Sequence, residues 1–592
     1  MKQISTLLRA RTLSIAVVIL ALITLPALAW TTHATEPTLQ LVTAGATGNG
    51  GNADSNRPSI SADGTKIAFF SRDNNLTPGM PDTGVRNVYL YDTLTHTFSL
   101  ISKGPDGLGG NDDSDLPSIS ADGTRIAFKS SASNLIDGLS PTEWEHIYVY
   151  DTHTEETILV TDGEFGVGGN NWSSYPTISG DGTKISFMSR ATNLIDGITT
   201  TSFENIFRFD IASEETTLIS GGALGLGGNN YSEVNDISYD GSRIAFLSTA
   251  TNLIAGTPTN SNQNFFLWDE NEGITLLTAG HGGDGSDYSG SWVGVPSISG
   301  DGTRVSFASA ATNLITGTTT NGVRNIFLWD EAEGVSLVTA GTGGDGGNAN
   351  SYGTWISGDG KMIGIMSSAS DLVNGLTTNG RRNVFLYNIA TQEMQLITKG
   401  ADGIGGDGQS NRPTLSTDGS VLAFHSSATD LLDEIIDSQG FANIYLWTAG
   451  STTHTVTFDT QDGNVASSAD VHDGNLATEP TPPSREGYNF EGWWTAPSSG
   501  GTRWNFATDT VTGDLTLYAR WSATSPDGGG TGNGTTPDTN QPGSTSPDAE
   551  KPPIDMANTG DNQLLWPALI AILLAGAGTT YALRRKNDKV ER

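Results

Sequence analysis

Short apolar runs alternate with polar, glycine-rich segments over most of the chain. The region between residues 115 and 161 shows the pattern, with apolar runs at 118–120, 126–128, 147–150 and 157–160. β-Branched and aromatic residues dominate these runs, and turn-forming residues bound each of them. Runs of this length and composition predict β-strands. We therefore expect four strands in this part of the chain.

The same pattern of four runs returns seven times. The stretch from Pro58 to Phe69 reads Pro-Ser-Ile-Ser-Ala-Asp-Gly-Thr-Lys-Ile-Ala-Phe, and its close variants place an Asp-Gly step every 58 to 61 residues. The seven steps begin at Asp63, Asp122, Asp181, Asp240, Asp301, Asp359 and Asp418. Because glycine reaches positive φ without steric cost, Asp-Gly-Thr predicts a tight hairpin. Four antiparallel strands repeated radially predict a β-propeller with seven blades.

The two ends of the repeat array complement each other. The last copy ends with the third-strand run Asn443–Trp447, and no fourth run follows it. The missing run lies at the other end, where Leu39–Gly45 matches Val335–Gly341 almost residue for residue. We therefore predict an all-β, seven-bladed propeller over residues 39–448, in which the N-terminal strand completes the last blade and removes the open edges.

Loop lengths indicate which face of the propeller binds partners. Two of the four connections in each repeat are tight turns, and the other two are long. Alternating strand direction places both long kinds on the same side of the disc, where variable loops on a rigid scaffold are typical of binding sites. The candidate contacts on this face are Trp144, Trp172, Tyr175, Tyr231, Trp292, Arg324, Tyr352, Arg381 and Arg382. Packing and solvation of the long loops is the alternative role for these side chains.

The repeat has a recognisable consensus. Ile-Ser-x-Asp-Gly-x-x-Ile-Ala-Phe followed by Asn-Ile-Phe-Leu-x-Asp resembles the WD40-like PD40 repeats of TolB-type propellers, from about residue 39 to 448. The resemblance implies the propeller fold. Members of that family serve as extracytoplasmic scaffolds and as non-catalytic domains beside peptidases, so the resemblance implies little about a specific activity.

A second unit follows the propeller at residues 454–523. Gly-Tyr-x-Phe-x-Gly-Trp occurs at 487–493 and Leu-Tyr-Ala-x-Trp at 517–521. This unit resembles the Listeria–Bacteroides repeat, the B-type repeat of internalin-like surface proteins. The resemblance implies a small β-grasp-like module used as a spacer. We expect Tyr488, Phe490, Trp493 and Trp521 to supply most of its core, because aromatic side chains bury large apolar areas.

The N-terminus predicts export. Lys2, Arg9 and Arg11 precede an apolar run from Leu13 to Leu28, and Ala27-Leu28-Ala29 suits cleavage, so residues 1–29 read as a signal peptide. A permanent N-terminal anchor is the alternative. The chain contains no cysteine, so we expect the exported domains to be stabilised by their cores rather than by disulfides.

The C-terminal part predicts a tether. Residues 524–555 are rich in Gly, Ser, Thr, Pro and Asp, which predicts a disordered linker. An apolar run from Leu564 to Leu583 and the basic Arg584-Arg-Lys586 then predict a transmembrane helix with a cytoplasmic end. Met556, Ala557, Asn558, Thr559 and Gly560 precede that run, and residues 556–592 together resemble a Gram-positive, LPXTG-like sortase signal. Retention as a single-pass membrane protein is the alternative.

The charge balance limits the partners. The formal net charge is −35, which argues against nucleic acid and anionic lipid surfaces as ligands. Asp106, Asp112, Asp113, Asp115, Asp284 and Asp287 are weak calcium candidates, since hard oxygen ligands beside turn glycines suit that ion. Glycine-rich turns without metal are the alternative, and no other cofactor is expected.

No catalytic motif stands out. The eight histidines show no zinc-type spacing, and neither a Gly-x-Ser-x-Gly elbow nor a cysteine nucleophile occurs. The sequence therefore predicts a non-enzymatic cell-surface adhesion protein, attached to the wall or membrane, that binds protein or glycan and has sortase as its processing partner. A structural envelope protein without a specific ligand and a surface glycan-active enzyme with a central pocket remain the alternatives.

Overall fold

The computed structural model describes residues 33–524 apart from short gaps, the longest of which are 45–49, 78–83, 433–439 and 462–466. All regular elements within this part are β-strands. Over the same residues there is no helix long and apolar enough to cross a membrane. The predicted signal peptide, most of the linker, the sorting signal and the C-terminal helix lie outside the described residues. They stay predictions.

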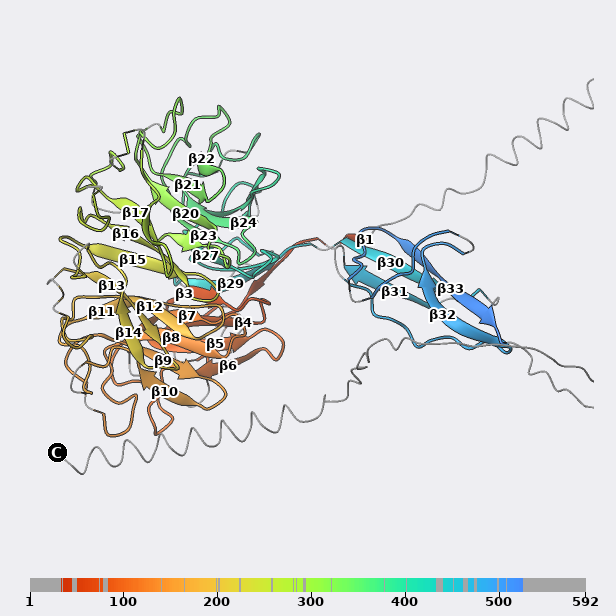
Figure 1. Cartoon of the computed structure of the whole chain (residues 1–592), viewed down its shortest axis with the longest axis horizontal. Coiled ribbons are helices and arrows are strands. Elements are labelled where there is room, and N and C mark those ends of the chain that lie inside the picture. Colours follow the sequence, from red (N-terminus) through yellow and green to blue (C-terminus); the bar gives the residue numbers. More distant parts are fainter. Residues whose placement is uncertain are drawn as a thin grey trace, which may run out of the picture. The chain divides into compact units, whose positions relative to one another are not determined.

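Six four-stranded antiparallel sheets are each built from strands that are consecutive in the chain (Figure 1). The first contains β3 (Ser55–Ile60), β4 (Lys66–Ser71), β5 (Asn87–Asp92) and β6 (Thr97–Leu100), and the second β7 (Ser114–Ile119), β8 (Arg125–Ser130), β9 (His146–Asp151) and β10 (Glu156–Leu159). The third contains β11 (Ser173–Ile178), β12 (Lys184–Ser189), β13 (Asn205–Asp210) and β14 (Glu215–Leu218), and the fourth β15 (Ser232–Ile237), β16 (Arg243–Ser248), β17 (Asn264–Asp269) and β18 (Gly273–Leu276). The fifth contains β19 (Ser297–Ile298), β20 (Arg304–Ser309), β21 (Asn325–Asp330) and β22 (Gly334–Leu337), and the sixth β23 (Ser351–Ile356), β24 (Met362–Ser367), β25 (Asn383–Asn388) and β26 (Met394–Leu396).

The seventh four-stranded sheet takes strands from both ends of the repeat region. Its order is β2 (Thr38–Leu41), β29 (Asn443–Thr448), β28 (Val421–Ser426) and β27 (Ser410–Leu415). Leu39 lies opposite Trp447 in the antiparallel β2–β29 pair, and the backbone N–H of Val42 donates to the carbonyl of Ile444 at 2.8 Å. The predicted all-β fold of four-stranded antiparallel sheets is thus confirmed.

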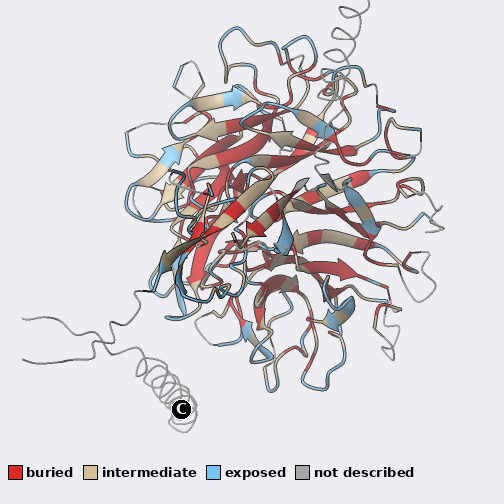
Figure 2. Cartoon of the chain, turned by 90° about the vertical axis from the view of Figure 1, so that its right-hand side faces the viewer, coloured by how far each residue is buried: buried red, intermediate tan, exposed pale blue. Residues whose placement is uncertain are grey.

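Burial explains why each repeat folds in this way. The second and third strands of a sheet are covered on both faces, as in β4 and β5, where almost every residue is buried. Strands packed on both faces carry continuous apolar runs, whereas a half-exposed strand alternates. The fourth strand β6 alternates between exposed and partly buried positions. Figure 2 shows the same gradient, with buried residues along the inner strands and exposed ones in outer strands and loops.

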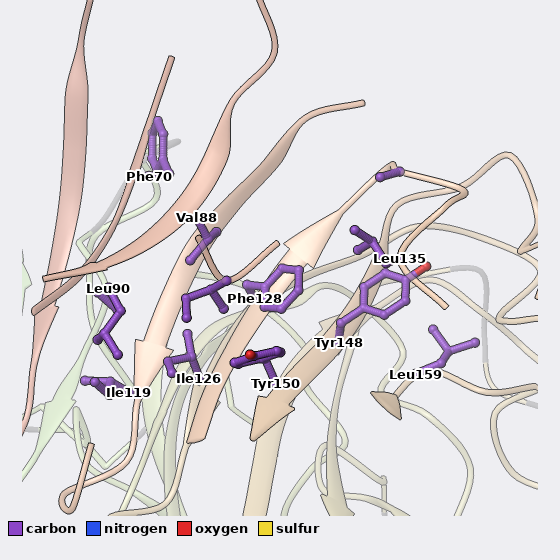
Figure 3. Close-up of a cluster of buried hydrophobic side chains, with 13 residues drawn as sticks. Phe70, Val88, Leu90, Ile119, Ile126, Phe128, Leu135, Tyr148, Tyr150 and Leu159 are labelled. Atoms are coloured by element: carbon purple, nitrogen blue, oxygen red, sulfur yellow. The ribbon is translucent and has the colours of Figure 1, made fainter. Parts of the chain in front are cut away.

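The core lies between neighbouring sheets. Val88 and Leu90 of β5 pack against Ile119, Ile126 and Phe128 of the second sheet (Figure 3). A cross-strand aromatic pair reinforces six of the sheets, and its ring centroids lie 5.5 to 5.9 Å apart. Such pairs add to area burial in stabilising a sheet. In the sixth sheet Ile365 stands opposite Phe385 instead.

A cycle of backbone hydrogen bonds joins the inner ends of the first strands. Ala62 N–H donates to the carbonyl of Ala121 at 2.8 Å, and Ala121 N–H donates to Gly180 at 2.9 Å. The cycle continues through residues 181, 239, 300, 358, 359 and 417, and Thr417 N–H donates back to the carbonyl of Ala62 at 2.8 Å. Every one of the seven sheets is therefore bonded to the next, and the last to the first.

The Asp-Gly steps form hairpin turns, as predicted. The Asp63 carboxylate accepts from Ser61 Oγ at 2.7 Å and from Thr65 N–H at 2.9 Å, and Gly64 has a φ of +74°. Burial opposes ionisation of Asp63, but these hydrogen bonds outweigh it and lower its pKa below the usual value. The repeated aspartates are therefore turn residues.

The second unit is a separate five-stranded sheet. It contains β1 (His33–Ala34), β30 (Thr452–Asp459), β31 (Ser467–His472), β32 (Tyr488–Trp494) and β33 (Leu515–Ala523), in the order β1-β30-β33-β32 with β31 paired to β30. Trp493 is buried, and Phe490 and Trp521 are half-buried against the same cluster. The core assignment of Tyr488 was wrong. Tyr488 begins the edge strand β32, is 40% exposed and lies under the guanidinium of Arg485.

Candidate functional site

Both kinds of long loop lie on one face, as predicted. Asn111 in a loop between sheets donates its backbone N–H to Asn134 Oδ1 at 2.9 Å, and Asn134 lies in a loop within a sheet. Asn111 Oδ1 in turn accepts from Ser133 N–H at 2.8 Å. Leu194, in the loop within the third sheet, is buried in the core between sheets. The loops are thus fixed to one another and to the scaffold.

A buried asparagine at the start of most third strands also holds these loops. Asn87 Oδ1 accepts from Ser102 Oγ at 3.0 Å and from Gly110 N–H at 3.2 Å. Asn264 makes the corresponding bond with Thr278 Oγ1 at 3.0 Å. A buried amide is stable only when its polar atoms are paired. The recurrence of Asn at this position in the sequence was the signal for this role.

The guanidinium of Arg190 lies beside two of the predicted binding residues. It lies 5.2 Å from the ring centroid of Trp172 and 5.9 Å from that of Tyr231. Phe203 packs edge-on against Tyr231, with centroids 5.0 Å apart. An ion pair of 2.6 Å from Arg190 to Glu204 fixes the guanidinium between the two rings. This arrangement joins loops of the third and fourth sheets.

Tyr352 is the centre of a second group. Arg324 and Arg382 lie 5.4 and 5.6 Å from its ring centroid, which are cation–π distances. Arg382 also donates to Gln409 Oε1. Three of the predicted residues are thus brought together on the fifth and sixth sheets, and Gln409 precedes the first strand of the seventh.

The remaining predicted residues are more scattered. Trp144 is 45% exposed. The backbone N–H of Arg381 donates to Asn379 Oδ1 at 3.1 Å. Tyr175 lies deeper, in the centre of the propeller, with the Arg57 guanidinium 5.8 Å from its ring. Trp292 lies outside the described residues. The assignment of all nine to ligand binding stays a prediction.

A cavity of about 210 Å³ opens among these side chains; we name it the mouth cavity. Trp172, Tyr175 and Tyr352 line it together with Glu204, Glu233, Gln263, Trp355 and Arg412. Concave sites with aromatic walls and a few polar groups are typical of ligand pockets. Three of the nine predicted residues therefore share one cavity.

The mouth cavity adjoins a second cavity of about 280 Å³, the channel cavity, which is lined by the first strands of all seven sheets. Tyr175, Val295, Trp355 and Arg412 line both. Five residues that line these two cavities have positive φ, although none is glycine: Arg57, Leu116, Tyr175, Val234 and Arg412. The first strands carry β-bulges at these points. Such conformations cost about 1–3 kcal/mol each and concentrate at functional sites.

Two carboxylates face the mouth cavity. Glu204 Oε1 accepts from Arg190 Nε at 2.8 Å, while its buried Oε2 has no hydrogen-bond partner among the described residues. Burial raises the pKa of Glu233, the charge of Glu204 raises it further, and Arg190 opposes both effects. The buried Oε1 of Gln263 likewise has no partner within the described part. The cavity thus offers hydrogen-bond acceptors to a ligand.

Two arginines approach each other at the junction of the cavities. Burial and the charge of Arg57 lower the pKa of Arg412 to about 9. Behind them, His425 Nδ1 accepts from Arg57 N–H at 3.4 Å. Burial and the neighbouring arginines lower the pKa of His425 to about 3, so its ring is neutral at physiological pH.

The predicted calcium ligands engage other partners. Arg86 pairs with Asp113 at 2.7 Å and with Asp115 at 2.6 Å. Asp287 accepts from Thr312 N–H at 2.7 Å, and Asp106 accepts from Leu108 N–H at 3.0 Å. Asp284 lies outside the described residues. Among those described, no group of three or more His, Asp and Glu side chains has the arrangement of a metal site. Calcium binding stays an untested prediction.

The sequence interpretation missed Arg57, Arg190, Glu204, Glu233 and Arg412. For two of them a signal existed. Ser-Asn-Arg-Pro occurs in both β3 and β27, whereas the residue before proline is Leu116, Tyr175 or Val295 in other copies. A position that varies within an otherwise regular strand marks a side chain that faces something other than the common core.

The profile of the Listeria-Bacteroides repeat domain matches residues 454–520, which confirms the predicted repeat. A Gly-rich membrane protein of Evansella cellulosilytica is 43% identical over 68 residues, covering 12% of this chain and 8% of that protein. Internalin H of Listeria monocytogenes is 45% identical over 73 residues, covering 12% of this chain and 13% of that protein. The matched stretch therefore spans about an eighth or less of these relatives.

The solved structures similar to this chain are propeller proteins. TolB from Acinetobacter baumannii has a TM-score of 0.31 at 15% identity and covers 59% of this chain and 65% of its own. Oligogalacturonate lyase in complex with manganese has a TM-score of 0.39 at 15% identity, with coverages of 71% and 98%. Acylaminoacyl peptidase has a TM-score of 0.40 at 13% identity, with coverages of 79% and 65%.

The similarity to oligogalacturonate lyase and to acylaminoacyl peptidase corrects the prediction that the chain is not an enzyme. Both are distant, and each shows only that folds of this kind also occur in enzymes. The physical reason for the error is that a site can be assembled from side chains of different sheets. Such a set leaves no local motif in the sequence, and the grouping of Glu204 with Glu233 is an example of what the linear pattern conceals.

Proposed function

We propose that this protein is displayed at a bacterial cell surface, where its loop face and mouth cavity bind a glycan or protein ligand. In this proposal the seven sheets form a closed seven-bladed propeller sealed by β2. The cycle of backbone bonds through Ala62 and Thr417 supports that arrangement. The repeat unit would serve as a spacer, and the relatives named as membrane proteins and as an internalin support a surface location.

The observation that carries the binding role is the grouping of aromatic and arginine side chains around one cavity. Trp172 and Tyr352 line the mouth cavity from different sheets, and arginines hold both rings in place. Aromatic residues and arginine dominate binding hot spots because they supply contact area with little loss of side-chain entropy. Because arginines hold these rings in place before a ligand binds, less side-chain entropy is lost on binding.

A glycan and protein array probed with the full chain tests this role. We expect selective binding that falls about tenfold or more in the W172A/Y352A double variant. Y239A is the matched control, because Tyr239 is 53% exposed but adjoins the Asp-Gly turns at the other end of the first strand. Absence of any ligand, or equal binding by the double variant, would favour a structural envelope role.

The proposed attachment has its own test. We propose that Thr559 and Gly560 are the sortase cleavage point and that the tail holds the protein at the cell surface. Cell fractionation of the wild type and a T559A variant should show wall-linked protein only for the wild type. Identical membrane retention of both would instead support a single-pass anchor.

A second candidate function is cleavage of a bound glycan. One observation favours it: Glu233, whose pKa burial raises, lies in the same cavity as Glu204, which pairs with Arg190. Two carboxyl groups in different environments of one pocket are the usual acid–base pair of glycan-cleaving enzymes. Reducing-end release from array-positive glycans, abolished by E233Q with binding retained, would establish it. Binding without release would limit the protein to recognition.

A further inference from the structure

Arg57 and Arg412 enter the channel at equivalent positions of neighbouring first strands. β3 and β27 share the sequence Ser-Asn-Arg-Pro, and both arginines sit on a β-bulge with φ of +53° and +50°. Thr417 N–H bonds to the carbonyl of Ala62, so the two strands are adjacent. Arg57 lines the channel cavity, and Arg412 lines both the channel cavity and the mouth cavity.

Neither guanidinium has an ion-pair partner within the described part of the chain. Several arginines elsewhere do form ion pairs: Arg243 pairs with Asp269 at 2.7 Å and Glu331 at 3.1 Å, and Arg125 pairs with Asp151 at 3.1 Å. In a protein with a net charge of −35, acidic partners are abundant. Two adjacent cations left without one are therefore a feature that folding alone does not explain.

The neighbouring side chains do not neutralise the positive charges of Arg57 and Arg412. The ring of His425 behind Arg57 is neutral, and Tyr175 offers only its π-face to Arg57. Burial and then the charge of Arg57 lower the pKa of Arg412. Two partly buried like charges that lie close together repel each other unless an anion binds beside them. A small anionic group would therefore balance the positive charges of these two arginines.

We propose that Arg57 and Arg412 bind the carboxylate of a small ligand that enters through the mouth cavity. Two guanidinium groups match a planar carboxylate through paired N–H···O bonds. The unpartnered acceptors Glu204 Oε2 and Gln263 Oε1 line the adjoining cavity, where they suit hydroxyl or amine donors on the rest of the ligand. The acidic side chains Glu204 and Glu233 line the adjoining cavity, so a ligand with a single carboxylate fits better than a polyanion.

This inference rests on the proposed ligand-binding role and gives the ligand its chemistry. Calorimetry with the full chain tests it, using D-glucuronate, the tripeptide Gly-Gly-Gly, D-glucose and inorganic phosphate as probes. We expect at least one of the two carboxylates to bind, and glucose and phosphate not to bind. Binding of glucuronate alone assigns the carboxylate to an acidic sugar, and binding of the tripeptide alone assigns it to a peptide C-terminus.

Variants separate a binding role from a structural one. R57Q/R412Q should weaken carboxylate binding about tenfold or more, and R125Q, which loses an ordinary ion pair, should leave it unchanged. Without ligand, R412Q should raise the melting temperature, because it removes an uncompensated buried charge. A purely structural arginine would lower that temperature.

Three results would overturn the proposal: no carboxylate binds, the double variant binds equally well, or phosphate binds in preference to both carboxylates. Array binding by the wild type that persists in R57Q/R412Q would refute this inference and leave the proposed function intact. Array binding lost in W172A/Y352A while calorimetric carboxylate binding persists would place the two ligands at separate sites, and that result would also overturn the inference.

Discussion

Thr43 Oγ1 donates a 3.0 Å hydrogen bond to Oδ1 of Asn443, which lies 400 residues further along the chain. The same oxygen accepts from Ile444 N–H at 3.0 Å. Within the fifth sheet, Thr339 makes the equivalent bonds to Asn325 at 3.2 Å and from Ile326 at 2.9 Å. The N-terminal segment therefore reproduces, from across the sequence, a contact that other sheets make within one repeat.

This relationship predicts the effect of removing the hydroxyl. T43V leaves Ile444 N–H buried without its partner, so we expect a loss of about 1–3 kcal/mol in unfolding free energy. T339V is the matched comparison inside a continuous repeat, and T43S should restore the bond. Urea unfolding of the full chain measures all three. An unchanged midpoint for T43V would show that β2 does not stabilise the seventh sheet.

The cycle of bonds at the inner strand ends predicts a glycine requirement. A Cβ on Gly300 would lie 2.7 Å from the carbonyl oxygen of Gly358, which accepts the Gly300 N–H bond. We expect G300A to lower the unfolding free energy by about 1–3 kcal/mol, because the clash displaces a buried hydrogen bond. G343A is the control, since its Cβ meets no atom within 4 Å. Equal stability of both variants in thermal unfolding would contradict this prediction.

Asp236 predicts a dependence of stability on pH. It accepts from Ile298 N–H at 3.0 Å, a role that Ser118 fills toward Ile178 at 3.1 Å. Burial raises the pKa of Asp236 from 3.8 to about 6, although backbone hydrogen bonds oppose the shift. A folded-state pKa above the unfolded value means that the folded protein holds the proton more tightly. The contribution of Asp236 is therefore greatest below about pH 4 and is lost as pH rises through 6.

D236S replaces this group with the side chain used elsewhere in the array. Because Asp236 lines the channel cavity and is only partly buried, we expect wild type to lose about 1–2 kcal/mol relative to D236S between pH 4 and pH 7. Chemical unfolding of both proteins across that range measures the difference, and all other titrating groups cancel. Parallel curves for the two proteins would be inconsistent with a raised pKa.

The burial of Trp493 predicts that its side chain stabilises the sheet of the repeat unit. Its ring is buried and packs edge-on against Phe458 at 5.1 Å and Phe490 at 5.5 Å between centroids. W493A should destabilise that sheet by about 3–5 kcal/mol, whereas Y488A at the exposed edge should cost less than about 1 kcal/mol. Hydrogen exchange followed by mass spectrometry resolves residues 454–523 in the full chain. Faster exchange in Y488A than in W493A would reverse the assignment of the core.

The sequence was most informative where a pattern repeats. The strands, the Asp-Gly turns and the displaced strand at Leu39 could be predicted from the repeat period, because every copy packs against its neighbours in the same way. The grouping of Arg190 and Trp172 with Tyr231 was hidden, because Tyr231 belongs to a different repeat. The cycle through Ala62 and Thr417 uses backbone atoms, which leave no residue signature.

The failed predictions have a common cause. Tyr488 was assigned to the core because its motif is aromatic, but its place at the start of an edge strand exposes it. Catalysis was excluded because no local motif occurs, yet Glu204 and Glu233 meet only in the folded protein. The type of a residue indicates which roles its side chain can have, but its neighbours in the folded protein determine which role it has.

The pairing of β2 with β29 has a consequence for biosynthesis. β2 is among the first parts of the propeller to be made, and its partner strand is the last. At about 5–20 residues per second, the 400 residues between Thr43 and Asn443 take roughly 20–80 seconds to translate. Throughout that interval the early strand has no native edge to join. Pairing of β2 with β29 therefore requires that the whole array has been made, and a truncated product keeps an unpaired sheet edge that quality-control proteases and chaperones can recognise.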